Sequence, residues 1–136
     1  MVRGMAMAAA LSAFAAGAAA GQTATDLVLG EGTAGAVVPG ALTGDAWADL
    51  RVVGTAGQLL MVDLDVGATD GDGTVYFNIL PPGSDDVAIW IGSMEPDRSA
   101  EVQLAEDGTY TIRTYLMGND RDAGRRVAYD LRVELR

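Results

Sequence analysis

The last third of the chain alternates between apolar and polar residues with a period of two, which predicts two long strands. One face of the first strand carries Tyr110, Ile112, Thr114 and Leu116. One face of the second carries Val127, Tyr129, Leu131, Val133 and Leu135, and its other face carries Arg126, Asp130, Arg132 and Glu134. The segment between the strands, residues 117–126, contains charges of both signs and two glycines, which is typical of a loop that presents side chains. We therefore expect contact with a partner first at this loop.

The same alternation, in shorter pieces, predicts further strands upstream. They span residues 47–53, 58–65, 74–80, 87–92 and 100–104, separated by turns rich in Gly, Pro and Asp. The spacing of the first two predicts a hairpin. Residues 36–43 contain Pro39, which confines that strand to a sheet edge. Residues 25–35 predict a weak edge strand or an unstructured lead-in.

The spacing of these elements predicts the fold class. Short strands follow one another at nearly regular intervals, and no segment after the amino terminus shows a helical period with caps. We expect an all-β fold, a single antiparallel β-sandwich of about seven or eight strands, formed by one domain over residues 25–136. A small closed barrel is the alternative.

Residues 1–24 are predicted to be a cleaved signal peptide. They combine a positive charge at Arg3, an alanine-rich apolar run and small residues at the positions a signal peptidase requires, with cleavage after Ala20 or Ala24. The alternative is a membrane anchor, because the apolar run approaches the length that spans a bilayer. Alanine is only weakly apolar, so we favour the signal peptide. It predicts a periplasmic or secreted protein with no membrane span after processing.

The composition narrows the possible functions. The 136-residue chain has no cysteine and no histidine. The missing cysteine removes disulfides, thiol chemistry and thiolate metal sites, so stability depends on packing alone. The missing histidine removes the usual general base and the commonest metal ligand. We therefore predict no catalytic residues and a protein that is not an enzyme.

The charge is strongly negative. Nine arginines and no lysine stand against nineteen Asp and Glu residues, which gives a formal net charge of −10. Such a surface repels nucleic acid and anionic lipid, and it speeds the encounter with basic proteins. The alternative is that the charge serves only solubility or adaptation to a salty habitat.

Four aspartates are candidate calcium ligands, because carboxylate oxygens are the ligands that calcium prefers. They are Asp63, Asp65, Asp70 and Asp72. The pattern from Asp70 onward departs from a helix-loop-helix calcium loop, since Pro81 occupies the twelfth position, where a bidentate Glu is needed. A structural turn is the favoured interpretation, so we predict no cofactor and keep calcium as the alternative.

Arginines in and before the charged loop are candidate binding residues. Arg113 precedes the loop, and Arg121, Arg125 and Arg126 lie within it beside carboxylates. Planar guanidinium donors either stiffen the loop through internal ion pairs or hydrogen-bond the carboxylates of a partner. Trp47, at the start of a strand, is either a rim of the core or a contact residue.

The same region resembles the periplasmic inhibitors of g-type lysozyme, small secreted β-sandwiches that block goose-type muramidases. The likeness is carried by Gly108-Thr-Tyr-Thr-Ile-Arg113, by Asn119-Asp120, and by Tyr129 with the alternating residues after it. In the family these segments read Gly-X-Tyr-X-Leu-Arg, Arg-Asn-Asp-Ala-Arg, and Tyr followed by alternating apolar residues. Domains found after secreted bacterial peptidases have a similar architecture. This chain differs from the inhibitors at Gly118, where the family has arginine, and at Arg121-Asp122, where it has Ala-Arg.

The resemblance implies a periplasmic protein that binds a basic lysozyme-like hydrolase and blocks its cleft with the charged loop. By match it assigns partner binding to Arg113, Asn119 and Asp120, and it offers Trp47 and Arg121 as substitutes, with Arg125 beside them. Arg121 is then expected to pair with the catalytic carboxylate, and Asp120 to orient Arg121. A second hypothesis, from a different class, is a non-catalytic accessory module of the envelope that binds glycan or calcium.

Overall fold

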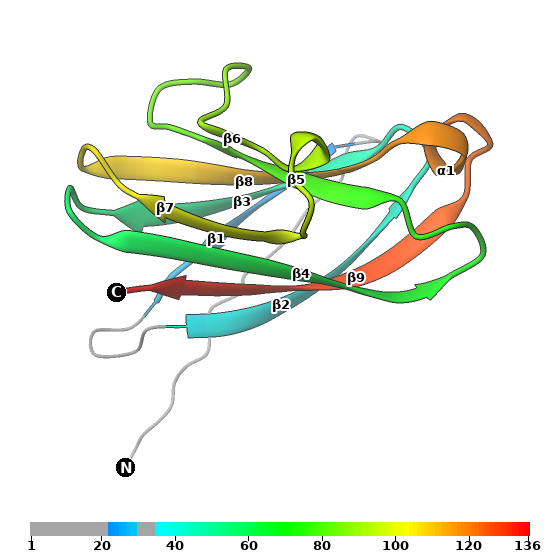
Figure 1. Ribbon diagram of the computed structural model, residues 1–136, viewed down its shortest axis with the longest axis horizontal. Coiled ribbons are helices and arrows are strands. Elements are labelled where there is room, and N and C mark those ends of the chain that lie inside the picture. The colour runs from blue at the N-terminus through cyan, green and yellow to red at the C-terminus, as the bar shows by residue number, and fades with distance from the viewer. Residues whose placement is uncertain (1–21, 30–34) are drawn as a thin grey trace, which may run out of the picture.

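The computed structural model describes residues 22–29 and 35–136, which form two β-sheets packed face to face (Figure 1). Sheet A has the strand order β1-β3-β8-β5-β6, and sheet B has the order β2-β9-β4-β7. The strands are β1 Gln22–Leu27, β2 Gly35–Thr43, β3 Trp47–Gly54, β4 Leu59–Thr69, β5 Val75–Leu80, β6 Trp90–Ile91, β7 Ser99–Gln103, β8 Gly108–Leu116 and β9 Arg126–Leu135. A 3₁₀ turn, η2 (Gly92–Met94), and a short helix, α1 (Gly118–Asp122), complete the described elements. The all-β sandwich is thus confirmed.

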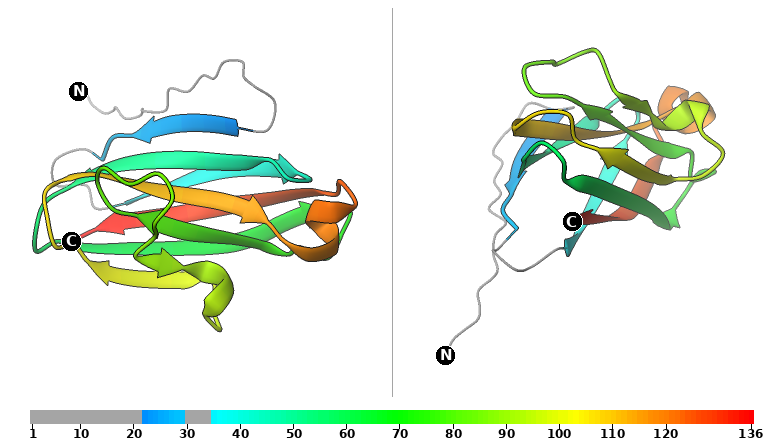
Figure 2. Two further views of the ribbon diagram at one scale, coloured as in Figure 1. Left: turned by 90° about the horizontal axis from the view of Figure 1, so that it is seen from above. Right: turned by 60° about the vertical axis from the view of Figure 1, so that its left-hand side comes forward.

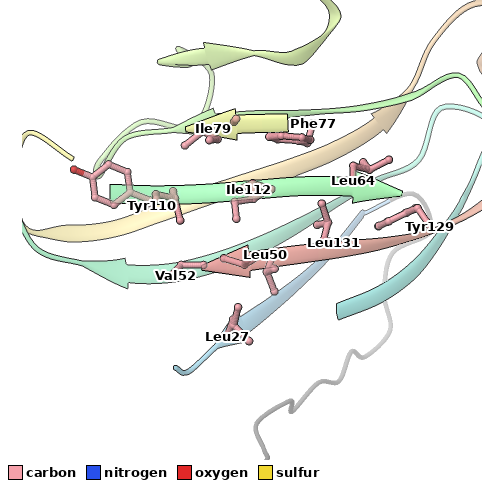
Figure 3. Packing of buried hydrophobic residues seen from close by; sticks show 14 of the residues in the cluster. Leu27, Leu50, Val52, Leu64, Phe77, Ile79, Tyr110, Ile112, Tyr129 and Leu131 are labelled. Atoms are coloured by element: carbon pink, nitrogen blue, oxygen red, sulfur yellow. The ribbon is translucent and has the colours of Figure 1, made fainter. Parts of the chain in front are cut away.

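The core lies between the sheets and is built by the alternation that the sequence shows. In β8, the predicted inward residues Tyr110, Ile112, Thr114 and Leu116 are all buried. β9 and β4 contribute Val127, Leu131, Val133, Leu60 and Val62 in the same way. Figure 3 shows Leu50 of β3, Ile112 of β8 and Leu131 of β9 among the packed side chains. Because one face of each sheet is apolar, stacking the two sheets removes both faces from water.

The predicted hairpin between residues 47–53 and 58–65 is wrong. β3 lies in sheet A between β1 and β8, whereas β4 lies in sheet B between β9 and β7. The segment between them crosses from one sheet to the other, so that the apolar faces of both strands meet across the core. β8 and β9 are likewise divided between the two sheets, and residues 117–125 connect them.

The described residues contain nine strands rather than seven or eight, and not all of them are antiparallel. β1 pairs in parallel with β3, with Gln22 opposite Trp47 and Leu27 opposite Val52. β1 therefore begins three residues before Thr25, where the domain was predicted to start. Cleavage after Ala20 leaves this strand whole, and cleavage after Ala24 removes half of it. The rest of the predicted signal peptide lies outside the described residues.

Two strands differ in length from their predictions. β2 runs unbroken through Pro39 and lies at the edge of sheet B, so the edge position predicted from Pro39 is confirmed. The strand predicted at residues 87–92 is reduced to the two residues of β6. Within the described ranges, no helix has the length and apolar character needed to cross a membrane.

Candidate functional site

The charged loop between β8 and β9 folds around a buried aspartate. Within the predicted loop, residues 118–122 form the helical turn α1, which the sequence pattern did not predict. Asp120, in the middle of α1, is 0% exposed. Its Oδ1 accepts the backbone N–H of Asp72 at 2.8 Å, and its Oδ2 accepts that of Thr74 at 2.7 Å. These N–H donors lower the pKa of the Asp120 carboxyl below its ordinary value, because they stabilise the charged form.

Hydrogen bonds join three segments at this end of the sandwich, which we call the charged end: residues 43–46, 66–74 and 117–126. The N–H of Arg126 donates to Asp70 Oδ1 at 2.8 Å, and Arg125 Nη1 donates to the carbonyl of Asp70 at 2.8 Å. The N–H of Gly44 donates to the carbonyl of Arg125 at 3.1 Å. Gly71 is required here, because a Cβ at this position would overlap the Asp120 carboxylate. Figures 1 and 2 show α1 beside the β4–β5 connection.

The charged end presents a few polar side chains to solvent. Asn119 and Arg125 are exposed, and the Arg121 side chain is 56% exposed. Arg121 Nη1 lies 3.7 Å from Asp122 Oδ1, and Asp122 is itself 74% exposed, so this ion pair holds the guanidinium only weakly. The expectation that Asp120 orients Arg121 is not met, because both Asp120 oxygens hold backbone N–H groups of the neighbouring loop.

Arg113 and Trp47 lie apart from the loop, on the outer face of sheet A. Arg113 Nε donates to Asp49 Oδ1 at 2.7 Å and its Nη2 to Asp49 Oδ2 at 2.9 Å, a bidentate pair across β3 and β8. Its Nη1 donates to the carbonyl of Asp85 at 3.0 Å, and its guanidinium carbon lies 5.5 Å from the centroid of the Trp47 ring. The hydrogen bonds to Asp49 raise the pKa of Arg113, against a smaller effect of burial. The Arg113 guanidinium is thus engaged within the fold, where it lies over the Trp47 ring, and it is not a free donor.

Two tyrosines extend this surface, and the sequence interpretation missed both. Tyr76 of β5 and Tyr115 of β8 have ring centroids 6.3 Å apart, and the Tyr115 hydroxyl donates to Asn78 Oδ1 at 2.7 Å. Together with Trp47 and Arg113 they form what we call the aromatic patch. The signal was available in the sequence, since Arg113 and Tyr115 alternate with the buried residues of β8 and must point outward.

The aromatic patch begins at the same end of sheet A as the charged end. Trp47 is the first residue of β3 and is in register with Tyr115, which lies two residues before the start of the segment at 117. The predicted residues therefore fall into two neighbouring groups. Trp47 and Arg113 belong to the aromatic patch, and Asn119, Arg121 and Arg125 belong to the charged end. Asp120 lies beneath the second group and shapes it.

The four candidate calcium ligands are not gathered into one site. Asp63 accepts a hydrogen bond from the Ser99 hydroxyl, and Asp65 lies in register with Asp130 on the strand pair β4–β9. Asp70 holds the backbone of Arg126, as described above. Over residues 22–29 and 35–136, no three His, Cys, Asp or Glu side chains are arranged to hold a metal ion. The prediction of no cofactor, with calcium as its alternative, stays a prediction.

Three solved structures that share this fold are those of lysozyme inhibitors. The structure is similar to that of PliG from Aeromonas hydrophila, a periplasmic lysozyme inhibitor of g-type lysozyme, with a TM-score of 0.70 and 24% sequence identity over 85% of this chain and 99% of that one. A mutant PliG from Escherichia coli gives a TM-score of 0.64 with 18% identity, over 86% of this chain and 100% of that one. PliG from Salmonella Typhimurium gives 0.63 with 14% identity, over 83% and 97%. No protein-family model and no curated protein sequence matches the chain significantly.

Proposed function

We propose that this protein is a periplasmic inhibitor of a g-type lysozyme and not an enzyme. The observation that carries the proposal is the shared fold, which extends over 85% of this chain and 99% of the Aeromonas hydrophila inhibitor. The sequence adds to this support, because Arg113, Asn119 and Asp120 match the family's pattern at the right intervals. No comparable observation favours the accessory module that binds glycan or calcium.

In this proposal the charged end enters the cleft of the lysozyme. Arg121 is the exposed cation of α1, and its ion-pair partner among residues 22–29 and 35–136, Asp122, lies 3.7 Å away and is itself solvated. Arg121 pairs with an active-site carboxylate of the lysozyme. This ion pair is strong when the guanidinium and the carboxylate are buried together and both stay hydrogen-bonded. Asn119, on the same turn, supplies a neutral donor and acceptor. Asp120 supports the contact from within by fixing α1 on the 66–74 loop.

The aromatic patch provides a second contact area beside the charged end. Tryptophan, tyrosine and arginine are the residue types that most often dominate binding energy at protein interfaces. Trp47, Tyr76 and Tyr115 are all half-buried, so they offer apolar surface without being part of the core. The Arg113–Asp49 pair keeps this surface rigid, which reduces the entropy lost on binding.

The negative charge of the chain suits a basic enzyme as the partner. The formal net charge of −10 produces a long-range attraction for a cationic protein, which raises the association rate and weakens as salt screens it. The charge contributes little to the specificity of the complex, which depends on the contacts at the charged end and the aromatic patch.

An inhibition assay tests the proposal. Purified protein is added in excess to a g-type lysozyme that lyses peptidoglycan, and a c-type lysozyme serves as the specificity control. We expect the activity of the g-type enzyme to fall to a small residue while the c-type enzyme is unaffected. Full activity of several g-type lysozymes at micromolar protein, with no complex detected by calorimetry, contradicts the proposal.

A further inference from the structure

The chain from the end of the β5–β6 connection through η2 exposes four large apolar side chains within eight residues. We call them the apolar ridge: Val87, Ile89, Ile91 and Met94. The residues between the first three, Ala88 and Trp90, are less exposed, so exposed and partly covered side chains alternate from 87 to 91. Single exposed apolar residues are common on soluble proteins, whereas several close together are typical of a surface that another molecule covers.

The apolar ridge is fixed to the sandwich by its own backbone and by its neighbours. Trp90 packs against the core, and the N–H of Ile89 donates to the carbonyl of Ile79 on β5 at 2.8 Å. The Ser84 hydroxyl donates to the carbonyl of Val87 at 2.8 Å and accepts the Val87 N–H at 3.0 Å. A surface that is already ordered loses little conformational entropy when a partner binds, so a modest apolar contact is sufficient for binding.

Exposed carboxylates flank the apolar ridge on both sides in the sequence. Two precede it and two follow it: Asp85, Asp86, Glu95 and Asp97. The cation of this stretch, Arg98, is turned toward β5, because its Nε donates to the carbonyl of Val75 at 2.9 Å and its Nη2 to that of Gly73 at 3.0 Å. Arg113, which donates to the backbone of residue 85, is paired with Asp49, as described above. The surroundings of the apolar ridge therefore carry an excess of negative charge.

The combination of apolar and acidic side chains decides which kind of partner fits. Nucleic acid and anionic lipid are repelled by the carboxylates. A second copy of this chain is disfavoured for the same reason, since contact between two apolar ridges brings both sets of carboxylates together. A neutral apolar surface removes water from the carboxylates without supplying a counter-charge. A polypeptide segment that carries both apolar and cationic side chains avoids all three costs.

We propose that the apolar ridge and its flanking carboxylates bind an extended cationic segment of a partner protein, in which apolar residues alternate with Lys or Arg. The apolar side chains of such a segment recur at every second residue, as the exposed side chains at 87, 89 and 91 do. Its cationic side chains pair with the carboxylates on either side of the ridge.

The apolar ridge lies away from the charged end of the sandwich. β5 begins at Val75, directly after the charged end, and ends at Leu80, where the connection to β6 begins. Figure 1 shows this connection standing out from the sandwich beside β6, away from α1. None of the residues that we assign to lysozyme contact belongs to the apolar ridge. The partner is therefore a second protein in addition to the lysozyme, and the proposal does not rest on the proposed function.

Calorimetric titration of the processed protein with the peptide acetyl-Lys-Leu-Lys-Leu-Lys-Leu-Lys-amide tests the proposal. We expect saturable binding at one site, weakened by added salt. A control peptide with the same residues in two blocks, three Leu followed by four Lys, should bind about fivefold more weakly or less, because its apolar residues do not follow the alternation of the ridge. Glu in place of every Lys should abolish binding. Equal affinity for the alternating and the blocked peptide would contradict the proposal, since it would mean that charge alone attracts them.

The double variant Val87→Ser, Met94→Ser, which we call the ridge variant, locates the binding site. Its two side chains are 67% and 75% exposed, so their replacement should leave the fold intact, and we expect the peptide affinity to fall about tenfold. The matched control is Val28→Ser with Val53→Ser, at 71% and 69% exposure on the β1–β3 side of sheet A. This control should keep the wild-type affinity, and an equal loss in both would overturn the proposal.

A pair of charge variants tests the carboxylates. Asp86→Asn with Asp97→Asn should weaken peptide binding and its salt dependence more than Asp65→Asn with Asp130→Asn, which removes the same charge from exposed positions on β4 and β9. Equal effects would assign the attraction to net charge and contradict the proposal. Sedimentation of the protein alone tests the other occupant: a dimer that dissociates in the ridge variant would assign the surface to a second copy instead. Because no lysozyme is present in these measurements, their failure leaves the proposed function untouched.

Discussion

The carboxylate of Asp120 receives the backbone N–H of Thr74 at 2.7 Å, although the two residues are 46 positions apart in the chain. This hydrogen bond joins the connection between β8 and β9 to the connection between β4 and β5. Each connection on its own is a polar surface segment. The bond to Thr74 and the companion bond to Asp72 make them one unit, from which Asn119 and Arg121 project. The shape of the charged end therefore depends on a residue that does not face solvent.

Replacing Asp120 by Asn is expected to lower the melting temperature by several degrees at neutral pH. An amide keeps one acceptor oxygen, but its NH₂ group faces a backbone N–H, so one of the two hydrogen bonds is lost. The pKa of Asp120 is lowered in the fold, so its stabilisation is complete above about pH 4, the ordinary range of an unfolded aspartate, and is lost as the pH falls through the folded value. Thermal melts of both proteins from neutral to acid pH measure this.

The difference in melting temperature between the wild-type protein and Asp120→Asn should therefore shrink as the solution is acidified. Asp122→Asn is the matched control, because Asp122 lies on the same turn but its side chain is 74% exposed. This control should change the melting temperature little at any pH. A difference between Asp120→Asn and wild type that stays constant down to strong acid would contradict the role we assign to the carboxylate.

The bidentate, half-buried Arg113–Asp49 pair is expected to stabilise the fold more than an exposed pair joined by one hydrogen bond. The two side chains are only 24% and 18% exposed, and they share two hydrogen bonds. A double-mutant cycle with Arg113→Gln and Asp49→Asn should give a coupling energy of about 1–2 kcal/mol. The same cycle on Arg51 and Asp26, whose side chains are 44% and 69% exposed at 2.8 Å, should give about 0–1 kcal/mol. Urea denaturation of each set of variants measures both couplings, and equal values would refute the distinction.

The alternation of residues was sufficient to predict which side chains form the core, but not which strands pair. In β8 and β9 every inward residue was identified, because a period of two assigns each residue to one of two faces. The same period does not say in which sheet a strand lies. Leu50 and Leu60 both face the core. They would do so whether their strands formed a hairpin within one sheet or lay in opposite sheets. The hairpin prediction failed for that reason.

The site was predicted less completely than the fold, for a related reason. A charged residue in a glycine-rich segment is usually solvated, so nothing local in the sequence marks Asp120 as buried. Its burial depends on the backbone of residues 72 and 74, which the fold brings from another connection. Arg113 was identified as a candidate, but its partner Asp49 was not, because the pairing of β3 with β8 was unknown. Contacts between segments far apart in the chain were the missing information.

Tyr129 is expected to make the protein sensitive to alkali. Its pKa is raised to about 12, since burial disfavours the phenolate. The stabilisation is complete below the unfolded value of about 10 and is lost as the pH rises from there to about 12, at most about 3 kcal/mol. Tyr129→Phe has no proton to lose at this position, so its stability should fall less over the same range. Urea denaturation at rising pH measures the difference, and parallel curves would exclude a contribution from Tyr129.

Arg121→Ala is expected to weaken inhibition of a g-type lysozyme by about tenfold or more without changing the melting temperature. Among the described residues the exposed guanidinium forms only a loose ion pair, with Asp122 at 3.7 Å, so its removal is expected to act mainly on the complex. Arg132→Ala is the matched control. It removes the same charge, and Arg132 is exposed on β9, away from the charged end. Inhibition curves and association rates at two salt concentrations separate contact from long-range attraction. Equal losses for both variants would mean that only net charge matters.

Gly118→Arg places an arginine where the family of inhibitors has one, and we expect it to improve inhibition at a small cost in stability. Gly118 has φ +65°, a conformation that costs a non-glycine residue about 1–2 kcal/mol, and a Cβ there meets no atom within 4 Å. Gly124→Arg is a closely matched control, with φ +68° and the same open space on the same segment. Both variants should lose similar stability in urea denaturation, since the backbone strain is the same. Only Gly118→Arg should lower the concentration needed for half inhibition, because its guanidinium adjoins Asn119; an equal gain from both would assign the effect to the added charge rather than to the position.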